Sequence, residues 1–300
     1  MEIVAIRPRV WLLPGSVNMG LVDCGAGLVA IDTGLDKQAG KRLLRAAAEL
    51  KLPLIAIINT HAHADHYGGN RTVLAESAAT VYAPAGEAAV MRRPLFEPEY
   101  LWQGARPFAA LQNKFLLADP TIVDVEFTPG DALDIGDVTF GTVSLPGHAH
   151  QQAGILVEGV LFAADAYFDV EVVNKHGIPY LVDHAATVTS ARKVVETAAD
   201  WYIPGHGQAT QHASPAVHHL LTRLEAVFEQ VVRAADGCGL DAVLATVCRR
   251  FELRPSAPGS HLLLRTPVAA CLTRAIEEGT VAVVLQDGEM LFQSTINRGN

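Results

Sequence analysis

Cysteines are scarce in this 300-residue sequence, and none is placed at the spacing of a metal or redox motif. Without a C-x-x-C pair, neither a cysteine metal site nor a disulfide framework is indicated for Cys24, Cys238, Cys248 and Cys271. Reduced thiols in a cytoplasmic protein are the simplest interpretation. The first residues, MEIVAIRPRVWLLPG, are too short and too interrupted for a secretory signal. We therefore expect a cytoplasmic location.

Basic residues and long apolar runs are also scarce. The chain has 23 Lys and Arg against 32 Asp and Glu, which gives a net charge of −9. Because binding to nucleic acid requires a basic face for the phosphates, we expect no nucleic-acid partner. No apolar run approaches the ~20 residues that cross a bilayer, so we expect no membrane partner either. Hydrophobic residues make up 50% of the chain, which is enough for a sizeable core.

The first two thirds of the chain alternate between predicted strands and helices. The run LPLIAIIN at 52–59 is continuously apolar and β-branched, which favours a strand buried on both faces. Helices are predicted at 36–51, about 70–77 and 185–199. Further strands are predicted within 4–31 and at 79–84, 121–128, 137–147, 153–159, 160–168 and 200–207. This alternation predicts an α/β fold.

From about residue 210 the pattern changes to longer helices. The segment 214–235 is predicted to be a helix with Ser214 as N-cap and Pro215 in the first turn. Two more helices are predicted at 240–251 and 262–279, followed by a hairpin over 281–294 that turns at Asp287-Gly288. We therefore predict two domains, residues 1–209 and a helical, winged-helix-like region at 210–300.

Side chains that bind metals follow the ends of four predicted strands. The stretch NTHAHADHYGGN, residues 59–70, comes directly after the strand at 52–59. Three later strands also stop at a histidine or an aspartate. Strand ends in layered α/β proteins gather at one edge, so we expect these side chains to converge. The candidate ligands are His61, His63, Asp65, His66, His148, Asp165 and His206.

Seven ligands are too many for one tetrahedral ion and suit two ions. With Asp165 as a bridge, the first ion would be bound by His61, His63 and His148. The second would be bound by Asp65, His66 and His206. In an extended loop, alternate side chains face together, so His61, His63 and Asp65 are expected on one side and His66 on the other.

The ligand chemistry limits the metal and suggests a reaction. Imidazole and carboxylate ligands accept zinc, manganese or iron, and two divalent ions, zinc first, are expected. A water shared by two cations loses its proton near neutral pH and attacks an acyl or phosphoryl centre. Asp65 would orient this hydroxide and pass the proton to the leaving group, which makes Asp65 the candidate catalytic residue. Gly68 and Gly69 would let the backbone turn tightly beside the metals.

Three residues after Asp165 are candidate contacts for a small-molecule substrate. Tyr167 or Tyr180 would hydrogen-bond a developing oxyanion, and Lys175 is the main candidate cation. The segment 86–118 carries five aromatic residues between prolines. Two interpretations stay open for this segment: core or homodimer interface, and an apolar lid over the site. An apolar acyl or aryl group in the substrate would fit the second interpretation.

The motif His61-x-His63-x-Asp65-His66, with Gly147-His148, Asp165 and Pro204-Gly205-His206-Gly207, resembles the metallo-β-lactamase-fold hydrolase superfamily. The order and spacing are similar to its glyoxalase II-like branch over roughly residues 10–209. This resemblance implies a four-layer αββα sandwich with metals at one edge between the sheets, and the C-terminal region is similar to the winged-helix-like tail of some members. The stretch Ile31-Asp32-Thr33-Gly34 also matches, which implies that Asp32 holds a ligand histidine.

The sequence departs from the glyoxalase II pattern after Asp165. A Gly-Cys-Gly-Arg-like stretch and basic residues for glutathione are replaced by AYFDVEVVNK. This departure argues against glutathione thioesters as substrates. We predict a metal-dependent hydrolase in which a hydroxide shared by two metal ions cleaves an ester, lactone or thioester. Alternatives are a phosphodiesterase, a one-iron persulfide dioxygenase using His61, His148 and Asp165, and a binding or regulatory protein with a structural metal.

Overall fold

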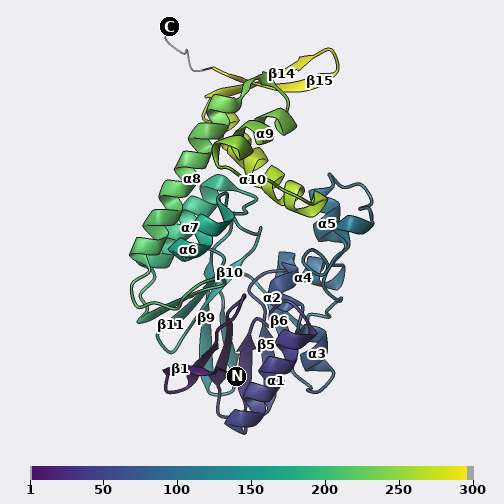
Figure 1. Cartoon of the computed structure of the whole chain (residues 1–300). Coiled ribbons are helices and arrows are strands. Elements are labelled where there is room, and N and C mark those ends of the chain that lie inside the picture. The colour runs from purple at the N-terminus through teal and green to yellow at the C-terminus, as the bar shows by residue number, and fades with distance from the viewer. Residues whose placement is uncertain (1, 296–300) are drawn as a thin grey trace.

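The computed structural model describes residues 2–295, which form three β-sheets flanked by helices (Figure 1). The first sheet has seven strands in chain order: Val4–Arg7 (β1), Val10–Leu13 (β2), Met19–Asp23 (β3), Leu28–Ile31 (β4), Leu54–Ile58 (β5), Thr80–Pro84 (β6) and Val125–Phe127 (β7). Strands β1 to β4 pair antiparallel, and β4 to β7 pair in parallel. The parallel half brings the carboxyl ends of β4 and β5 to the same edge.

The second sheet has five strands in the order β12-β11-β10-β9-β8. Their bounds are Ala132–Ile135 (β8), Val138–Ser144 (β9), Ala153–Val157 (β10), Val160–Ala164 (β11) and Trp201–Pro204 (β12). Strands β11 and β12 are parallel, and the other pairs are antiparallel. The carboxyl ends of β9, β11 and β12 therefore lie at one edge of this sheet.

Alternating side chains place the two large sheets face to face between layers of helices. In β11, Val160 and Phe162 enter the core between the sheets, whereas Leu161 and Ala163 face the helices on the outer side. On the opposite side, Ile57 of β5 packs with the apolar face of the first helix. The predicted four-layer αββα sandwich is thus observed.

The two long helices predicted for the sandwich, at 36–51 and 185–199, are observed nearly in full, whereas the short helices differ from the prediction. The first helix, Lys37–Leu50 (α1), starts where Asp36 accepts hydrogen bonds from two backbone N–H groups. The helix predicted from residue 70 stops early, and two short helices were not predicted, at Ala64–Tyr67 (α2) and Val170–His176 (α6). The remaining bounds are Asn70–Leu74 (α3), Ala85–Arg92 (α4) and His184–Glu196 (α7).

The C-terminal region contains three helices and a third, antiparallel sheet. Its elements are Ser214–Ala234 (α8), Asp236–Cys238 (β13), Leu240–Arg250 (α9), Pro258–Glu277 (α10), Val281–Gln286 (β14) and Glu289–Ser294 (β15). The hairpin turns at Asp287 and Gly288 as predicted, both with positive φ. The prediction of Ser214 as N-cap was wrong, because Ala213 holds the cap position and Ser214 is already helical beside Pro215.

The long helix α8 joins the sandwich to the C-terminal region, as its path in Figure 1 shows. Leu220 and Leu224 in its first half pack in the cluster beside the second sheet. Val227 and Val231 in its second half pack in a separate cluster with α9 and α10. The division of the chain near residue 209 stays a prediction, because α8 contributes to both clusters.

The aromatic segment forms α4, a short helix at Phe96–Leu101 (α5) and a 3-10 turn at Ala109–Leu111 (η1). Leu101, Leu111 and Leu116 pack against Leu262 of α10. The side chains of Tyr100 and Phe115 are 59% and 63% exposed, so they are not core residues. Within residues 2–295, no helix has the length and apolar composition needed to cross a bilayer.

Phe140 tests the importance of the core between the sheets. Its side chain lies in β9 and is fully buried in that core. Phe140→Ala should lower the free energy of unfolding by about 3–5 kcal/mol, since the surrounding strands cannot close the cavity. Denaturant unfolding measures this, with exposed Thr139→Ala on the same strand as control. A loss below about 1 kcal/mol would mean that the sheets close around the missing ring.

Candidate metal centre

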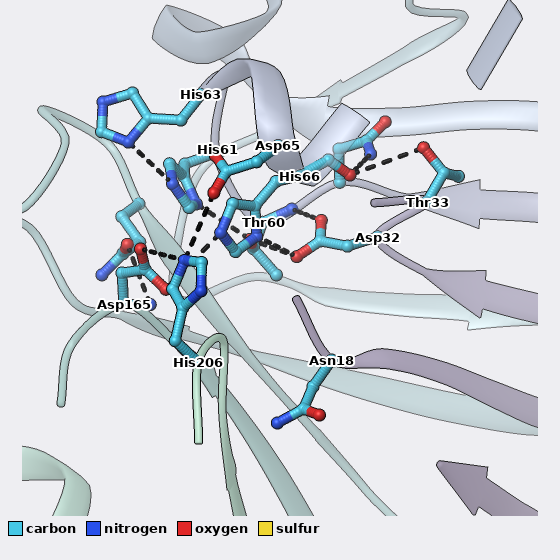
Figure 2. A network of polar contacts seen from close by, with 12 residues as sticks. Asn18, Asp32, Thr33, Thr60, His61, His63, Asp65, His66, Asp165 and His206 are labelled. Carbon is cyan, nitrogen blue, oxygen red and sulfur yellow. Dashed lines mark hydrogen bonds and ion pairs between the residues drawn. The ribbon is translucent and has the colours of Figure 1, made fainter. Parts of the chain in front are cut away.

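The seven predicted ligands come together at the edge where strands of both sheets end. His61 and His63 follow β5 of the first sheet, and Asp65 and His66 lie on α2. The second sheet supplies His148 after β9, Asp165 after β11 and His206 after β12. Figure 2 labels all of these side chains except His148 and shows them approaching one another from the two sheets. Three overlapping groups have ligand atoms within 4.8 Å of one another: His61, His63 and His148; His61, His66 and Asp165; Asp65, His66 and His206.

The expectation that His61, His63 and Asp65 face together along an extended loop was wrong at Asp65. His63 is the last extended residue, and the helix α2 begins at Ala64. Successive residues on a helix point about 100° apart rather than to opposite sides. Asp65 and His66 can therefore both reach His206, which explains the third group.

Four of the histidines are held in the same tautomer by oxygen atoms around the site. His61 Nδ1 lies 3.0 Å from Thr60 Oγ1, and His66 Nδ1 lies 2.8 Å from Asp32 Oδ2. His148 Nδ1 donates to the Tyr180 carbonyl at 3.0 Å, and His206 Nδ1 donates to the Ser16 carbonyl at 2.6 Å. Since each Nδ1 is paired with an oxygen atom, Nε2 is the nitrogen of each ring that is left to face the centre.

Three imidazole nitrogens meet in the group formed by His61, His63 and His148, which we call the first side of the centre. His63 Nδ1 lies 3.0 Å from His61 Nε2 and 2.8 Å from His148 Nε2. Burial lowers the pKa of His63 to about 4 and that of His148 to about 3, and burial also places the pKa of His61 well below its usual value. These rings are therefore neutral near pH 7 and can donate their lone pairs to a cation.

On the second side of the centre, formed by Asp65, His66 and His206, carboxylates determine the charge of the histidines. His206 Nε2 lies 3.3 Å from Asp65 Oδ2 and 3.4 Å from Asp165 Oδ2. Burial opposes charge on His206, but Asp165 and Asp65 outweigh this effect and raise its pKa to about 10. Burial likewise opposes charge on Asp65, yet the hydrogen bond from His206 holds its pKa well below the usual value.

Asp165 joins the two sides. Its Oδ2 lies 3.1 Å from His148 Nε2, and its Oδ1 lies 3.5 Å from His66 Nε2. Within residues 2–295, neither His66 Nε2 nor Asp165 Oδ1 has a hydrogen-bond partner, although both are buried. Buried polar atoms without partners are costly and rare in proteins. A divalent cation would satisfy such atoms, so the residues present fit a metal site.

Asp32 holds the first-sheet side of the centre in place. Its Oδ1 accepts from the Thr60 N–H, and its Oδ2 accepts from the Thr60 hydroxyl and from His66 Nδ1, each at 2.8 Å. The residue has φ 56°, a left-handed conformation that aims the carboxylate along the edge. The predicted contact between Asp32 and a candidate ligand histidine is therefore observed, with His66.

Asn18 supports His206 and was not found by sequence reasoning. Its side-chain N–H group donates to the carbonyls of Pro204 at 2.9 Å and Gly207 at 2.8 Å. Its backbone N–H donates to the Gly205 carbonyl at 2.8 Å. The side chain is buried, so it fixes the backbone on both sides of His206 (Figure 2). A single Asn between two strands carries no sequence signal for this role.

Glu87 of α4 joins two of the ligand loops and was also missed. Its Oε2 accepts from the Ala62 N–H at 2.9 Å, between His61 and His63. Its Oε1 accepts from the Gln151 N–H at 2.8 Å, in the loop that carries His148. The carboxylate is buried, at 5% exposure, so both hydrogen bonds are shielded from water. Glu87 thereby sets the separation of the two loops.

Glycines let the chain approach the centre closely. A Cβ on Gly205 would lie 2.0 Å from Asp165 Oδ1, and one on Gly68 would lie 2.0 Å from the Leu35 carbonyl oxygen. Gly68 has φ −60° and Gly69 has φ −81°, so neither adopts the special turn conformation that the sequence suggested. Both are needed because neighbouring backbone lies against them.

A cavity of about 450 Å³ opens beside the ligands. The ring of Tyr180 lines it, with its centroid 5.5 Å from that of His148, and its hydroxyl hydrogen-bonds Thr266. Tyr167 is not at the cavity: its buried ring packs between the second sheet and the outer helices. Lys175 is exposed and is not among the lining residues, whereas its neighbour His176 is. The predicted substrate contacts thus reduce to Tyr180.

Glu87→Gln tests the link between the two loops. The amide can accept only one of the two backbone hydrogen bonds, and its NH2 group would face the other N–H. We expect metal affinity about 10–100-fold weaker than in the wild type, the usual cost of losing a supporting contact. Competition with a chromophoric chelator measures this, with the exposed Glu49→Gln of α1 as control. Equal affinities in the two variants would contradict a positioning role for Glu87.

The chain is similar to known proteins across most of its length. It is 31% identical over 94 residues to an (R)-specific secondary-alkylsulfatase from a Pseudomonas species, covering 27% of this chain and 14% of that protein. It is 29% identical over 172 residues to a hydroxyacylglutathione hydrolase from Alkalilimnicola ehrlichii, covering 56% of this chain and 51% of that protein. The chain thus spans about half the length, or less, of these curated relatives.

Solved structures share the fold. A metallo-β-lactamase family protein from Thermus thermophilus superposes with a TM-score of 0.75 at 22% identity, covering 97% of this chain and 100% of that one. The model of the metallo-β-lactamase superfamily matches residues 12–206, which include every ligand described above. The chain therefore belongs to the metallo-β-lactamase superfamily.

Proposed function

We propose that this protein is a binuclear metal-dependent hydrolase that cleaves an ester, lactone or thioester bond. One observation carries the proposal. The Nε2 atoms of His66, His148 and His206 lie within 3.5 Å of the carboxylate of Asp165, and one oxygen of this buried carboxylate has no hydrogen-bond partner within residues 2–295. A structural metal site is closed, but this centre forms the wall of a cavity that a small molecule can enter.

The ligands divide between two positions. His61, His63 and His148 form the first set, Asp65, His66 and His206 form the second, and Asp165 contacts members of both sets. Zinc suits these nitrogen and oxygen ligands, with manganese or iron as alternatives. Two bound divalent cations would supply an activated water and would polarise the carbonyl oxygen of the substrate.

The chain's own residues have three tasks in this proposal. Thr60, Asp32 and the carbonyls of Ser16 and Tyr180 keep the imidazoles in one tautomer. Asp65 lies at the cavity wall, so its carboxylate can hold the proton of the attacking water and deliver it to the leaving group. The apolar walls exclude competing water from the reacting carbonyl.

The metal content of purified protein is the first test. Protein prepared without chelator or added metal should contain about two zinc or manganese ions per chain by plasma mass spectrometry, with activity on ester, lactone or thioester panels. Removal of the metal by a chelator should abolish activity, and two equivalents of zinc should restore it. One iron per chain, with oxygen uptake on persulfides, would favour the one-iron dioxygenase instead. Full activity without metal would exclude both.

Asp65→Asn tests the proton-transfer role of a residue that also belongs to the second ligand set. The amide has the same shape but cannot take a proton, so kcat should fall about 10²–10⁴-fold. The measurement is steady-state hydrolysis with metal content determined on the same sample, so that lost metal is not mistaken for lost proton transfer. Asp287→Asn, at an exposed hairpin turn that suits Asn-Gly, is the matched control. A fully loaded Asp65→Asn variant with wild-type kcat would rule out this role.

A further inference from the structure

The cavity beyond the metal ligands is built by two segments that lie far from them in sequence. Phe115 and Leu116 come from the aromatic segment, and Leu263 and Leu264 come from α10 of the C-terminal region. Figure 1 shows α10 extending toward α5 across the open side of the sandwich. Leu116 and Leu263 also pack in one cluster with Leu262, so the two segments form a continuous wall.

This wall is apolar. Ile178 and Pro179, which precede Tyr180, line the cavity together with the leucines of α10. The polar side chains besides the ligands are few: Glu97 of α5, His176 of α6 and Ser260 of α10, with the hydroxyl of Tyr180 turned to Thr266. An apolar wall of this kind binds the hydrocarbon part of a ligand, because burial of that part removes it from water.

The cavity wall also lacks the basic side chains that would bind an anionic substrate. Among the residues that line the cavity, within 2–295, there is no lysine and no arginine. Glu97 is a carboxylic acid in this wall, and the chain carries a net charge of −9. Away from the candidate metal ligands, a phosphate or carboxylate on the acyl part of a substrate would meet no lysine or arginine among these lining residues, and its desolvation would be costly.

We infer that this cavity is an acyl-chain pocket, in which uncharged, medium-length aliphatic acyl groups lie between Phe115 and the Leu263–Leu264 face of α10. The inference rests on the proposed function, because it names the acyl part of that substrate. A volume of about 450 Å³ lies within the range of small-molecule pockets, ~300–1,000 Å³, so a medium-length acyl chain can be accommodated.

Ligand binding tests the pocket without requiring turnover. The neutral fluorophore N-phenyl-1-naphthylamine should bind the purified protein and be displaced by methyl butanoate, hexanoate, octanoate and decanoate. Affinity should rise up to roughly fourfold per methylene, the value for complete burial of a CH₂ group. A methyl ester of equal length with a terminal carboxylate should bind at least about tenfold more weakly than the neutral ester.

Three variants locate the site of binding. Leu263→Trp adds bulk to the wall and should abolish the gain from hexanoate to decanoate. Phe115→Ala truncates a side chain that is 63% exposed, so it should fold normally and weaken decanoate about tenfold. Leu285→Trp makes the same change as the first variant at a hairpin residue that is 80% exposed, and it should behave like the wild type. Circular dichroism confirms folding, and Phe115→Ala decides the test if Leu263→Trp does not fold.

The outcomes separate this inference from the proposed function. Affinities that change less than about twofold over the series, or equal effects of Leu263→Trp and Leu285→Trp, would overturn the acyl pocket. Equal binding of the carboxylated ester would overturn its charge preference. Chain-length-dependent binding with no hydrolysis of any ester by metal-loaded protein would support the pocket and contradict the hydrolase. Hydrolysis with flat chain-length dependence of binding would do the reverse.

Discussion

The buried carboxylate of Asp165 is the constraint on which the rest of the site depends. At 4% exposure it cannot be solvated, and one of its oxygens has no hydrogen-bond partner within residues 2–295. A buried charge of this kind is tolerated only when opposite charge or metal compensates it. The chain places three imidazoles within 3.5 Å of this carboxylate, on loops that leave both sheets. Hydrophobic packing brings the two sheets together at this edge. The same close contact is needed to bring the imidazoles of both sheets to the buried Asp165 carboxylate.

The supporting contacts cross between segments rather than staying within them. Glu87 reaches two ligand loops, and Asn18 reaches the His206 loop from the turn before β3. The Thr60 carbonyl accepts from the Ala153 N–H, which ties the first sheet directly to the second. Most of these contacts use backbone N–H and carbonyl groups, whose positions are fixed by the strands. The positions of the candidate ligands are thus set by the geometry of the sheets. A small shift between the sheets would move both halves of the centre.

Sequence reasoning was strongest where chemistry and periodicity agree. The seven ligands follow β5, β9, β11 and β12 because each strand ends in an unusual histidine or aspartate, and parallel strands end at a common edge. It failed where the role depends on backbone contacts. Glu87 is one glutamate among many, and nothing local marks its two N–H partners. Tyr167 was expected at the substrate because it follows Asp165, but its side chain points into the outer hydrophobic cluster instead. Asp65 was assigned an extended backbone, although a helix begins one residue earlier.

Different parts of the chain form the metal-binding wall and the apolar wall of the cavity. The family match at residues 12–206 contains all seven ligands and the sheets that position them. Ser260, Leu263 and Leu264 lie outside this match and yet face the same cavity as His63 and Asp165. The helix α8 connects the two parts rigidly, because its first half packs on the sandwich and its second half packs on α9 and α10. A change in the sequence of α10 can therefore reshape the cavity without moving a ligand, because α10 does not contribute to the hydrogen bonds that orient the imidazoles. In the proposed function, hydrolysis and substrate selection are then separable properties, the first set by the strand ends and the second by the helix that covers them.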